Sequence, residues 1–465
     1  MANEMLNKIE ERKKNWEEGA LKKGLERFRL KEYPNKFYTP LDIKDHNFLE
    51  KVGFPGEYPF TAGRYSVQLM GLMTRGGGDS GTAMRRAGQY SGYGTATDSR
   101  DFYRAMQERG WTGGPNIAFD LPSQICYDSD HPLAEGEVGK VGVAVDTLHD
   151  FETIYEAFTG DKDLDKIASN FTINAPANII LAMYFTLAEK RGIPLEKLVA
   201  TPQNDILKEF VSRGTYIFPI KPSMRMTRDT MVFCTEHTPL LNFISICGYH
   251  IREAGCSAVQ VLGFTLSNAI AFVQLGIDAG LDVDKFSPQM TFLGLSGSMD
   301  IYWEIAVRRA QRRMWAKIMR ERFGAKNPKS LIFRGGEGIS SISETTYQRP
   351  LNNLTRTVIM GVASAFAGGP PAAFPPYDEP LGLGWSLEAQ QLSTDASRIM
   401  LHEANLCKVI DPLAGSYFIE SLTDQAEEEA WKIIEKIDAM GGSVAAIENG
   451  WMQKEIAQSA YEYQR

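Results

Sequence analysis

Short apolar runs alternate with longer amphipathic stretches along most of the chain. From about residue 115 onward, eight apolar runs are predicted as strands, although some could be pieces of helix: 116–119, 141–145, 168–173, 198–200, 243–247, 290–293, 331–333 and 362–367. The stretches between them, such as 178–191, 266–280 and 299–323, have the length and apolar spacing of helices. This alternation predicts an α/β fold with a parallel sheet. A (β/α)8 TIM barrel and a doubly wound open sheet both satisfy the pattern.

The two ends of the chain differ from this pattern. Residues 3–28 alternate acidic and basic side chains around a thin apolar stripe that includes Met5, Ile9 and Trp16, as in a helix. A solvated helix on the main domain and a docking surface for a partner both fit. Residues 389–404 and 424–440 are predicted helices. We therefore expect an N-terminal helical arm and linker at 1–57, a barrel at 58–385 with a Gly-rich insertion at 69–88, and a C-terminal helical region at 386–465.

Composition narrows the class of protein. A chain of 465 residues with 43% hydrophobic content can bury a large core, and the net charge of −8 argues against a general nucleic-acid surface. The five cysteines are widely spaced without a CxxC pair, so we expect reduced thiols and no metal site built from them. The N-terminus is too charged for a signal peptide, and no apolar run approaches the ~20 residues needed to span a bilayer. We expect a cytoplasmic enzyme.

The segment 201–219 carries polar residues where an apolar run gives way to a helix. Gln203, Asn204 and Asp205 can accept hydrogen bonds from the free N–H groups of the first helical turn. Arg213 follows at the helix end, before Gly214. Two interpretations of Arg213 remain open: a helix-end charge that pairs with Glu209 at i−4, or an anion ligand in a pocket.

A second segment, 244–250, also runs from an apolar strand into polar residues. It ends in Gly248, Tyr249 and His250. A lone histidine is usually only a satisfied polar residue. A catalytic role is favoured for His250 because it follows the C-terminal end of a predicted strand, and such strand ends supply the catalytic groups in α/β barrels.

Four long blocks carry a resemblance to a known family. They are QNDILKEF (203–210) with an Arg three residues later, SICGYH (245–250), AFDLPSQICYDSDHP (118–132) and KVIDPLAGSYFIESLT (408–423). In this order they resemble the large, substrate-binding subunit of the coenzyme-B12-dependent acyl-CoA mutases, the methylmalonyl-CoA mutase family, over roughly residues 55–465. The resemblance favours the barrel, makes it CoA-binding, and implies a radical 1,2 rearrangement of an acyl-CoA skeleton with adenosylcobalamin as cofactor.

The resemblance assigns roles to individual residues. His250 matches the histidine that hydrogen-bonds the thioester carbonyl, and Gln203 and Tyr249 match residues beside the thioester and the cofactor. Tyr90 and Arg213 match the pair that contacts a free substrate carboxylate in the methylmalonyl enzymes. Isobutyryl-CoA mutases have Phe and Gln at these two positions, and 2-hydroxyisobutyryl-CoA mutases lack the Tyr. We therefore expect a dicarboxylic acyl-CoA, because a buried guanidinium is costly opposite an apolar group.

Further contacts are implied by the same matches. The expected substrate and CoA contacts are Tyr65, Thr172, Thr201, Asn170, Gln289, Arg75, Arg85 and Arg86, and the expected cofactor contacts are Glu379 and Gly336. Glycines 76–81 lack the GxxxxGK[ST] pattern, so a flexible loop is favoured there over a phosphate cradle.

Departures from the methylmalonyl pattern limit the choice of substrate. Val67 stands where a Thr is usual, Asn170 replaces a Ser and Gln289 replaces an Arg. Gly336 and Gly338 stand where the family shows His and Gln. Smaller residues leave more room, so the sequence suggests a succinyl-CoA or malonyl-CoA with a bulky alkyl or aryl substituent.

The family's cobalt-ligating signature, Asp-x-His-x-x-Gly, is absent from this sequence, since none of its six histidines stands in that pattern. We expect no cobalamin-binding domain in this chain, and a separate small subunit that supplies the cobalt ligand in a heterotetramer or heterodimer. Three alternatives remain: methylmalonyl-CoA mutase proper, a non-catalytic partner subunit of such a mutase, and a barrel enzyme that works without cobalamin. Retention of His250, Gln203 and Arg213 argues against a degenerate partner subunit.

Overall fold

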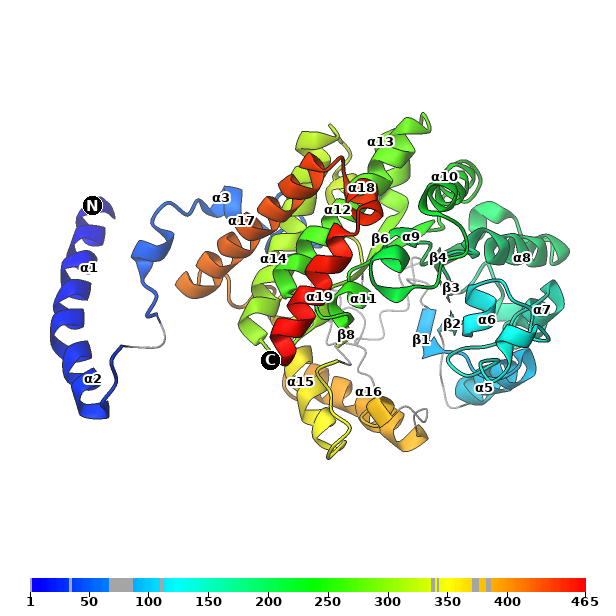
Figure 1. Cartoon of the computed structure of the whole chain (residues 1–465), viewed down its shortest axis with the longest axis horizontal. Coiled ribbons are helices and arrows are strands. Elements are labelled where there is room, and N and C mark those ends of the chain that lie inside the picture. The colour runs from blue at the N-terminus through cyan, green and yellow to red at the C-terminus, as the bar shows by residue number, and fades with distance from the viewer. Residues whose placement is uncertain are drawn as a thin grey trace.

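The computed structural model describes residues 2–32, 36–66, 87–108, 113–335, 339–340, 343–369, 376–381 and 386–465. Helices surround short parallel strands in the body of the molecule, and the first two helices, α1 (Ala2–Trp16) and α2 (Lys22–Phe28), stand apart from that body (Figure 1). A π-helical turn, Glu17–Leu21, joins them, so 3–28 is helical as predicted.

The strands are all parallel to their neighbours. A four-stranded sheet has the order β1 (Ala87–Ser91), β2 (Gly114–Ala118), β3 (Ala168–Thr172) and β4 (Val199–Pro202). Two further pairs are β5 (Ile244–Cys247) with β6 (Met290–Gly294) and β7 (Ser296–Gly297) with β8 (Ile339–Ser340). The Ser245 N–H donates to the Gln203 carbonyl at 2.8 Å, so β5 lies beside the end of β4.

This arrangement confirms a mixed α/β fold with parallel strands in sequence order. The described strands form sheets of four, two and two, so closure into a single eight-stranded barrel stays a prediction. One isolated bridge extends the series, because Phe292 of β6 pairs with Gly335.

The predicted strands are confirmed where the chain is most apolar. The runs 116–119, 168–173, 198–200, 243–247 and 290–293 correspond to β2 to β6, while 141–145 contributes only bridges from Val143 to Gly94 and Phe119. The strand at 331–333 is wrong, since Pro328–Leu331 forms a 3-10 turn and 332–333 are irregular. The strand at 362–367 is also wrong, because almost all of that run belongs to helix α15 (Asn352–Phe366).

Helices follow most strands and cover the ends of the molecule. The three helices predicted in the body are α8 (Ala177–Lys190), α12 (Ala258–Asp278) and α14 (Ile301–Lys317), and the two at the C-terminal end are α16 (Leu387–His402) and α17 (Tyr417–Ala439). The remaining helices are α3 (Phe48–Lys51), α5 (Ala96–Glu108), α6 (Leu121–Gln124), α7 (Leu148–Tyr155), α9 (Ile206–Lys208), α10 (Ile220–His237), α11 (Tyr249–Glu253), α13 (Val283–Phe286), α18 (Ser443–Glu448) and α19 (Trp451–Gln464).

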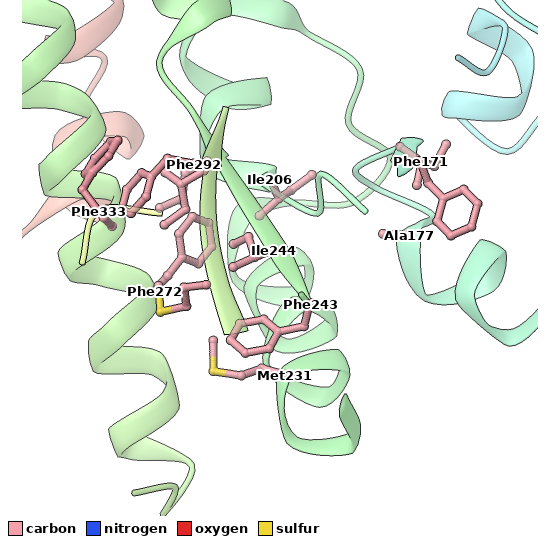
Figure 2. Close-up of a cluster of buried hydrophobic side chains, with 14 of the residues drawn as sticks. Phe171, Ala177, Ile206, Met231, Phe243, Ile244, Phe272, Phe292 and Phe333 are labelled. Carbon is pink, nitrogen blue, oxygen red and sulfur yellow. The ribbon is translucent and has the colours of Figure 1, made fainter. Parts of the chain in front are cut away.

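The main apolar core lies between the strands and their covering helices. Figure 2 shows Phe292 of β6 beside Phe333. Met231 of α10 and Phe243, which directly precedes β5, lie further along the same cluster. The Phe292 and Phe333 rings stack with centroids 3.9 Å apart. Because these side chains are almost fully buried, the core fixes the strand ends that carry the polar residues described below.

One helix of the described residues, α12, is long and apolar enough to cross a membrane by length and composition alone. The expectation that no apolar run approaches that length is therefore wrong for residues 258–278. Two thirds of its apolar window (67%) is buried inside the protein, against α14 and α17 among others, as in a core helix.

Ion pairs attach the C-terminal region to the body. Helix α14 buries four arginines, and the Arg309 guanidinium lies 3.0 Å from a carboxylate oxygen of Asp411 and 2.7 Å from one of Glu420 in α17. The Arg312 guanidinium donates to the carbonyls of Phe60 and Thr61. Helix α14 therefore joins the segment before β1, the body and the C-terminal helices through buried charge.

Candidate active site

The polar groups that follow β3, β4 and β5 meet at one edge of the structure. These strands are parallel and adjacent, so their C-terminal ends point the same way. The Asn204 N–H donates to the Ile173 carbonyl at 2.9 Å, which ties the end of β4 to the end of β3. Thr172, Gln203 and His250 therefore belong to one region, as expected from their places in the sequence.

Gln203 lies in a buried cluster of polar side chains. Its Oε1 accepts hydrogen bonds from Nδ2 of Asn174 at 3.1 Å and from Nζ of Lys208 at 3.0 Å. The same two donors bind Oε1 of Glu209, each at 2.7 Å. With both donors on its oxygen, the Gln203 amide is held with its NH2 group directed away from them.

Glu209 links this cluster to Arg213. The Arg213 guanidinium lies 3.3 Å from Oε1 of Glu209, so the predicted i−4 pairing exists, and its side chain is 19% exposed. Burial would raise the pKa of Glu209, but the Lys208 and Arg213 cations outweigh it and hold that pKa below its usual value. The pairing leaves most of the five N–H donors of Arg213 uncommitted to Glu209, so it does not exclude an anion ligand.

His250 is the second residue of the short helix α11, directly after β5. Its Nδ1 lies 3.1 Å from Sγ of Cys247, and the Tyr249 ring meets the imidazole edge to face at 5.3 Å. Burial, reinforced by the Lys208 and Arg213 cations, lowers the pKa of His250 well below its usual value. The imidazole is therefore neutral at physiological pH, and one nitrogen donates while the other accepts.

Asp205 connects the two strand ends. Its carboxylate accepts from the Lys208 N–H at 3.2 Å, which confirms it as the cap of α9, and from the Cys247 N–H at 2.7 Å. Burial raises the pKa of Asp205 to about 6, against the opposing effect of the Lys208 ammonium and these N–H groups. Gly214 ends the π-helical turn Glu209–Arg213 in the left-handed conformation (φ 88°), as predicted for the residue after a helix.

A row of polar residues crosses the four-stranded sheet. Tyr90, Asn116, Asn170 and Thr201 are in register on β1 to β4. Asn116, Asn170 and Thr201 are partly exposed although apolar neighbours such as Ile117 are buried. One face of the sheet is therefore polar and accessible, unlike the packed interior of an ordinary barrel.

The other expected contacts are more scattered. Thr201 accepts from the Asn242 amide at 2.8 Å, and Tyr65 is 36% exposed with the Arg64 guanidinium over its ring at 5.2 Å. Gln289 lies before β6, at the opposite end of that strand, where its Nε2 donates to the carbonyls of Thr238 and Leu241 at 2.9 Å each. The structure does not bring Gln289 together with His250.

Glu379 lies close to the helix that carries His250. Burial raises the pKa of Glu379 to about 7, and the carboxylates of Asp378 and of Glu253 in α11 act in the same direction. The side chain of Tyr90, together with Arg75, Arg85, Arg86 and Gly336, lies outside the residues that the structure describes. Within the described residues, no three His, Cys, Asp or Glu side chains gather as they would around a metal ion.

Sequence reasoning does not identify Asn174, Lys208 or Cys247 as part of this site. A signal for two of them exists. Asn174 follows β3 as Gln203 follows β4, and Lys208 interrupts the apolar residues of a buried helical segment. Cys247 gives no such signal, because a cysteine at a buried strand end is ordinary.

Comparisons with known proteins place these residues in a family context. The model of the family described as methylmalonyl-CoA mutase matches residues 31–465. The large subunit of 2-hydroxyisobutanoyl-CoA mutase from Aquincola tertiaricarbonis is 39% identical over 99% of this chain and 80% of that protein. Methylmalonyl-CoA mutase from Escherichia coli (strain K12) is 41% identical over 80% of this chain and 51% of that protein. The methylmalonyl-CoA mutase large subunit from Streptomyces virginiae is 37% identical over 91% and 55%. The chain thus spans about half the length of these methylmalonyl-CoA mutases.

Proposed function

Because the chain belongs to the methylmalonyl-CoA mutase family, a family of isomerases, we propose that it is the large, substrate-binding subunit of an adenosylcobalamin-dependent acyl-CoA mutase. Its reaction is a radical 1,2 rearrangement of the carbon skeleton of a dicarboxylic acyl-CoA of the succinyl-CoA or malonyl-CoA type. The glycines at 336 and 338 favour a bulky alkyl or aryl substituent on that acyl group.

The neutral His250, at the same strand edge as Gln203, carries this proposal. A neutral imidazole and an oriented amide can each donate one hydrogen bond to a thioester carbonyl without adding charge to the site. Charge shifts onto that oxygen as the skeleton rearranges, and donors already in place stabilise it at no cost in reorganisation.

Arg213 is the reason for proposing a dicarboxylic substrate. Its guanidinium is mostly buried, and Glu209 engages it through one N–H donor at 3.3 Å. The remaining donors suit a carboxylate bound through two parallel hydrogen bonds, together with the hydroxyl of Tyr90. The polar row Asn116, Asn170 and Thr201 supports a barrel whose interior is open to the CoA chain.

The described residues fit the cofactor at its nucleoside end. Glu379, with its raised pKa and its place beside α11, suits a ribose hydroxyl, and Tyr249 lies on the same helix as His250. Adenosylcobalamin, when bound, supplies the radical that removes a substrate hydrogen. The cobalt ligand comes from a separate small subunit, a proposal supported by the name "large subunit" of two relatives.

A second candidate is a 2-hydroxyacyl-CoA mutase. It is favoured by the similarity to the large subunit of 2-hydroxyisobutanoyl-CoA mutase, which extends over 99% of this chain. The two candidates differ in whether Arg213 meets a substrate carboxylate.

The test combines the purified chain with a cobalamin-binding small subunit and adenosylcobalamin. Succinyl-CoA, methylmalonyl-CoA, isobutyryl-CoA, 2-hydroxyisobutyryl-CoA and alkyl- or aryl-substituted succinyl-CoAs are assayed by mass spectrometry, with Arg213→Gln as the matched variant. We expect isomerisation of the carboxylate-bearing substrates only, and a loss of at least about 100-fold in kcat/KM in Arg213→Gln, the cost of removing a bidentate charged contact. Turnover of 2-hydroxyisobutyryl-CoA alone would establish the second candidate, and turnover of isobutyryl-CoA would overturn the role of Arg213 as a carboxylate ligand. If methylmalonyl-CoA is turned over and the bulkier succinyl-CoAs are inert, the proposed bulky substituent is overturned.

A further inference from the structure

The turn between β5 and α11 brings Cys247 against the ring of His250. Gly248 makes this turn, and a Cβ on it would lie 2.7 Å from Oγ1 of Thr265 and 3.0 Å from the Gly294 carbonyl oxygen. A larger residue at this position would therefore push Thr265 or the end of β6 aside, and glycine lets the turn keep this path. On this path Sγ of Cys247 and Nδ1 of His250 are 3.1 Å apart.

The environment of the sulfur decides which atom donates. Cys247 is 1% exposed, and burial raises the pKa of its thiol to about 11, so the sulfur carries its proton. The backbone N–H groups of Tyr249 and His250 are directed at the sulfur, where they partly offset this rise in pKa. A protonated thiol at this distance has its S–H available to donate to the imidazole nitrogen. An imidazole nitrogen is also a better acceptor than a thiol sulfur.

A second contact holds Cys247 in place. The carboxylate of Asp205 accepts the Cys247 backbone N–H at 2.7 Å, and Asp205 in turn caps α9 beside Gln203. The strand end that carries the thiol is thus fixed by the same loop that carries the other carbonyl donor.

We propose that Cys247 is a positioning residue whose S–H donates to Nδ1 of His250 and thereby keeps the imidazole proton on Nε2. In a neutral imidazole, the nitrogen that accepts a hydrogen bond carries no proton, so the partner of Nδ1 sets the tautomer. The Nε2–H then offers a donor to the substrate. The opposite tautomer would turn a lone pair toward the carbonyl oxygen and repel it. The benefit to catalysis rests on the proposed function, but the tautomer itself does not.

The matched variants are Cys247→Ser, which keeps a donor, and Cys247→Ala, which removes it. The full chain is labelled with ¹⁵N-histidine, and the His250 resonances are assigned by their loss in His250→Gln. We expect an unprotonated Nδ1 and a protonated Nε2 in the wild type and in Cys247→Ser, and an Nδ1-protonated population in Cys247→Ala. With the small subunit and cofactor present, kcat of Cys247→Ala falls about tenfold with little change in KM, the loss expected for one hydrogen bond, while Cys247→Ser stays near the wild type.

Each result supports or overturns the inference. A proton on Nδ1 in the wild type, or an Nε2–H tautomer unchanged in Cys247→Ala, overturns it even if acyl-CoA turnover proceeds. The expected tautomers in a protein that turns over no acyl-CoA would uphold the hydrogen bond and overturn the proposed function instead. A fall of the same size in both variants, with unchanged tautomers and circular dichroism, would overturn the role of the donor.

Discussion

At the scale of single residues, the site is organised by buried charge. Lys208 has no exposed surface, and its cost of burial is offset by Glu209 and Gln203 within hydrogen-bonding distance. The same ammonium fixes the Gln203 amide and helps to keep His250 neutral. Charge is therefore used here to set the orientation and protonation of two neutral donors.

Glu379 gives the pH prediction at this scale. Its folded pKa of about 7 exceeds the ordinary value of 4.5, so the folded chain holds a proton that the unfolded chain has already released between these limits. Ionised Glu379 therefore destabilises the fold above pH 7, and this cost disappears as the pH falls toward 4.5. We expect the unfolding free energy of the wild type, relative to Glu379→Gln, to rise steadily from pH 8 to pH 5 in urea denaturation.

The control is Glu388→Gln, which removes one carboxylate from an exposed position on α16. A stability difference between the wild type and Glu379→Gln that stays constant across the pH range would show that Glu379 is not responsible. The same pH dependence in the comparison of the wild type with Glu388→Gln would show this too.

Sequence reasoning succeeds at this scale where contacts are local. The Asp205 cap, the Arg213–Glu209 pair and the left-handed Gly214 all depend on spacing within one helical segment, which helix geometry fixes. Contacts such as Asn174 with Gln203 or Asp205 with the Cys247 N–H join separate strand ends. They depend on the packing of strands that no local pattern encodes.

At the scale of elements, strands were predicted where apolar runs are short and bounded. The run 362–367 failed because a short apolar run does not distinguish a buried strand from a segment of helix. It continues the helical pattern of α15, and its small residues Ala363, Ser364 and Ala365 are buried against neighbouring elements. Length would have decided correctly, because the helix begins ten residues earlier.

Helix α14 gives the prediction at the element scale. Arg309→Met leaves Asp411 and Glu420 buried without their main counter-charge, and breaking such a pair costs about 3–5 kcal/mol. The matched control is Arg322→Met, since Arg322 follows α14 and pairs with Asp438 of the same helix α17, but with both side chains about 40% exposed. An exposed pair is worth about 1 kcal/mol or less.

Urea denaturation of the two variants measures the difference directly. Equal losses would mean that burial does not strengthen this contact. A loss below about 1 kcal/mol for Arg309→Met would mean that the C-terminal region is held by its apolar contacts alone.

At the scale of the whole molecule, the order of parallel strands was predictable, but the closure of the sheet was not. Alternation of strand and helix fixes the sequence order of the units. Whether the last strands pair with the first depends on the tilt of the strands relative to the barrel axis. It also depends on segments such as 333–335, where strand pairing is reduced to one bridge between Phe292 and Gly335. The family resemblance, not the pattern, favoured a barrel over an open sheet.

The N-terminal arm gives the last prediction. No described residue of 4–32 is buried, and Met5 and Phe28 are 65% and 69% exposed, so α1 and α2 add little to the core (Figure 1). Deleting residues 2–32 should therefore shift the melting temperature of the isolated chain by less than about 2 °C, because few buried contacts are lost.

If the arm is a docking surface, the same deletion weakens binding of the cobalamin-binding small subunit at least about tenfold, the effect of about 1.4 kcal/mol of interface contacts. Calorimetric melting and titration of the small subunit measure the two effects separately. A large fall in melting temperature would show that the arm stabilises the body. Unchanged binding would place the small subunit elsewhere on the chain.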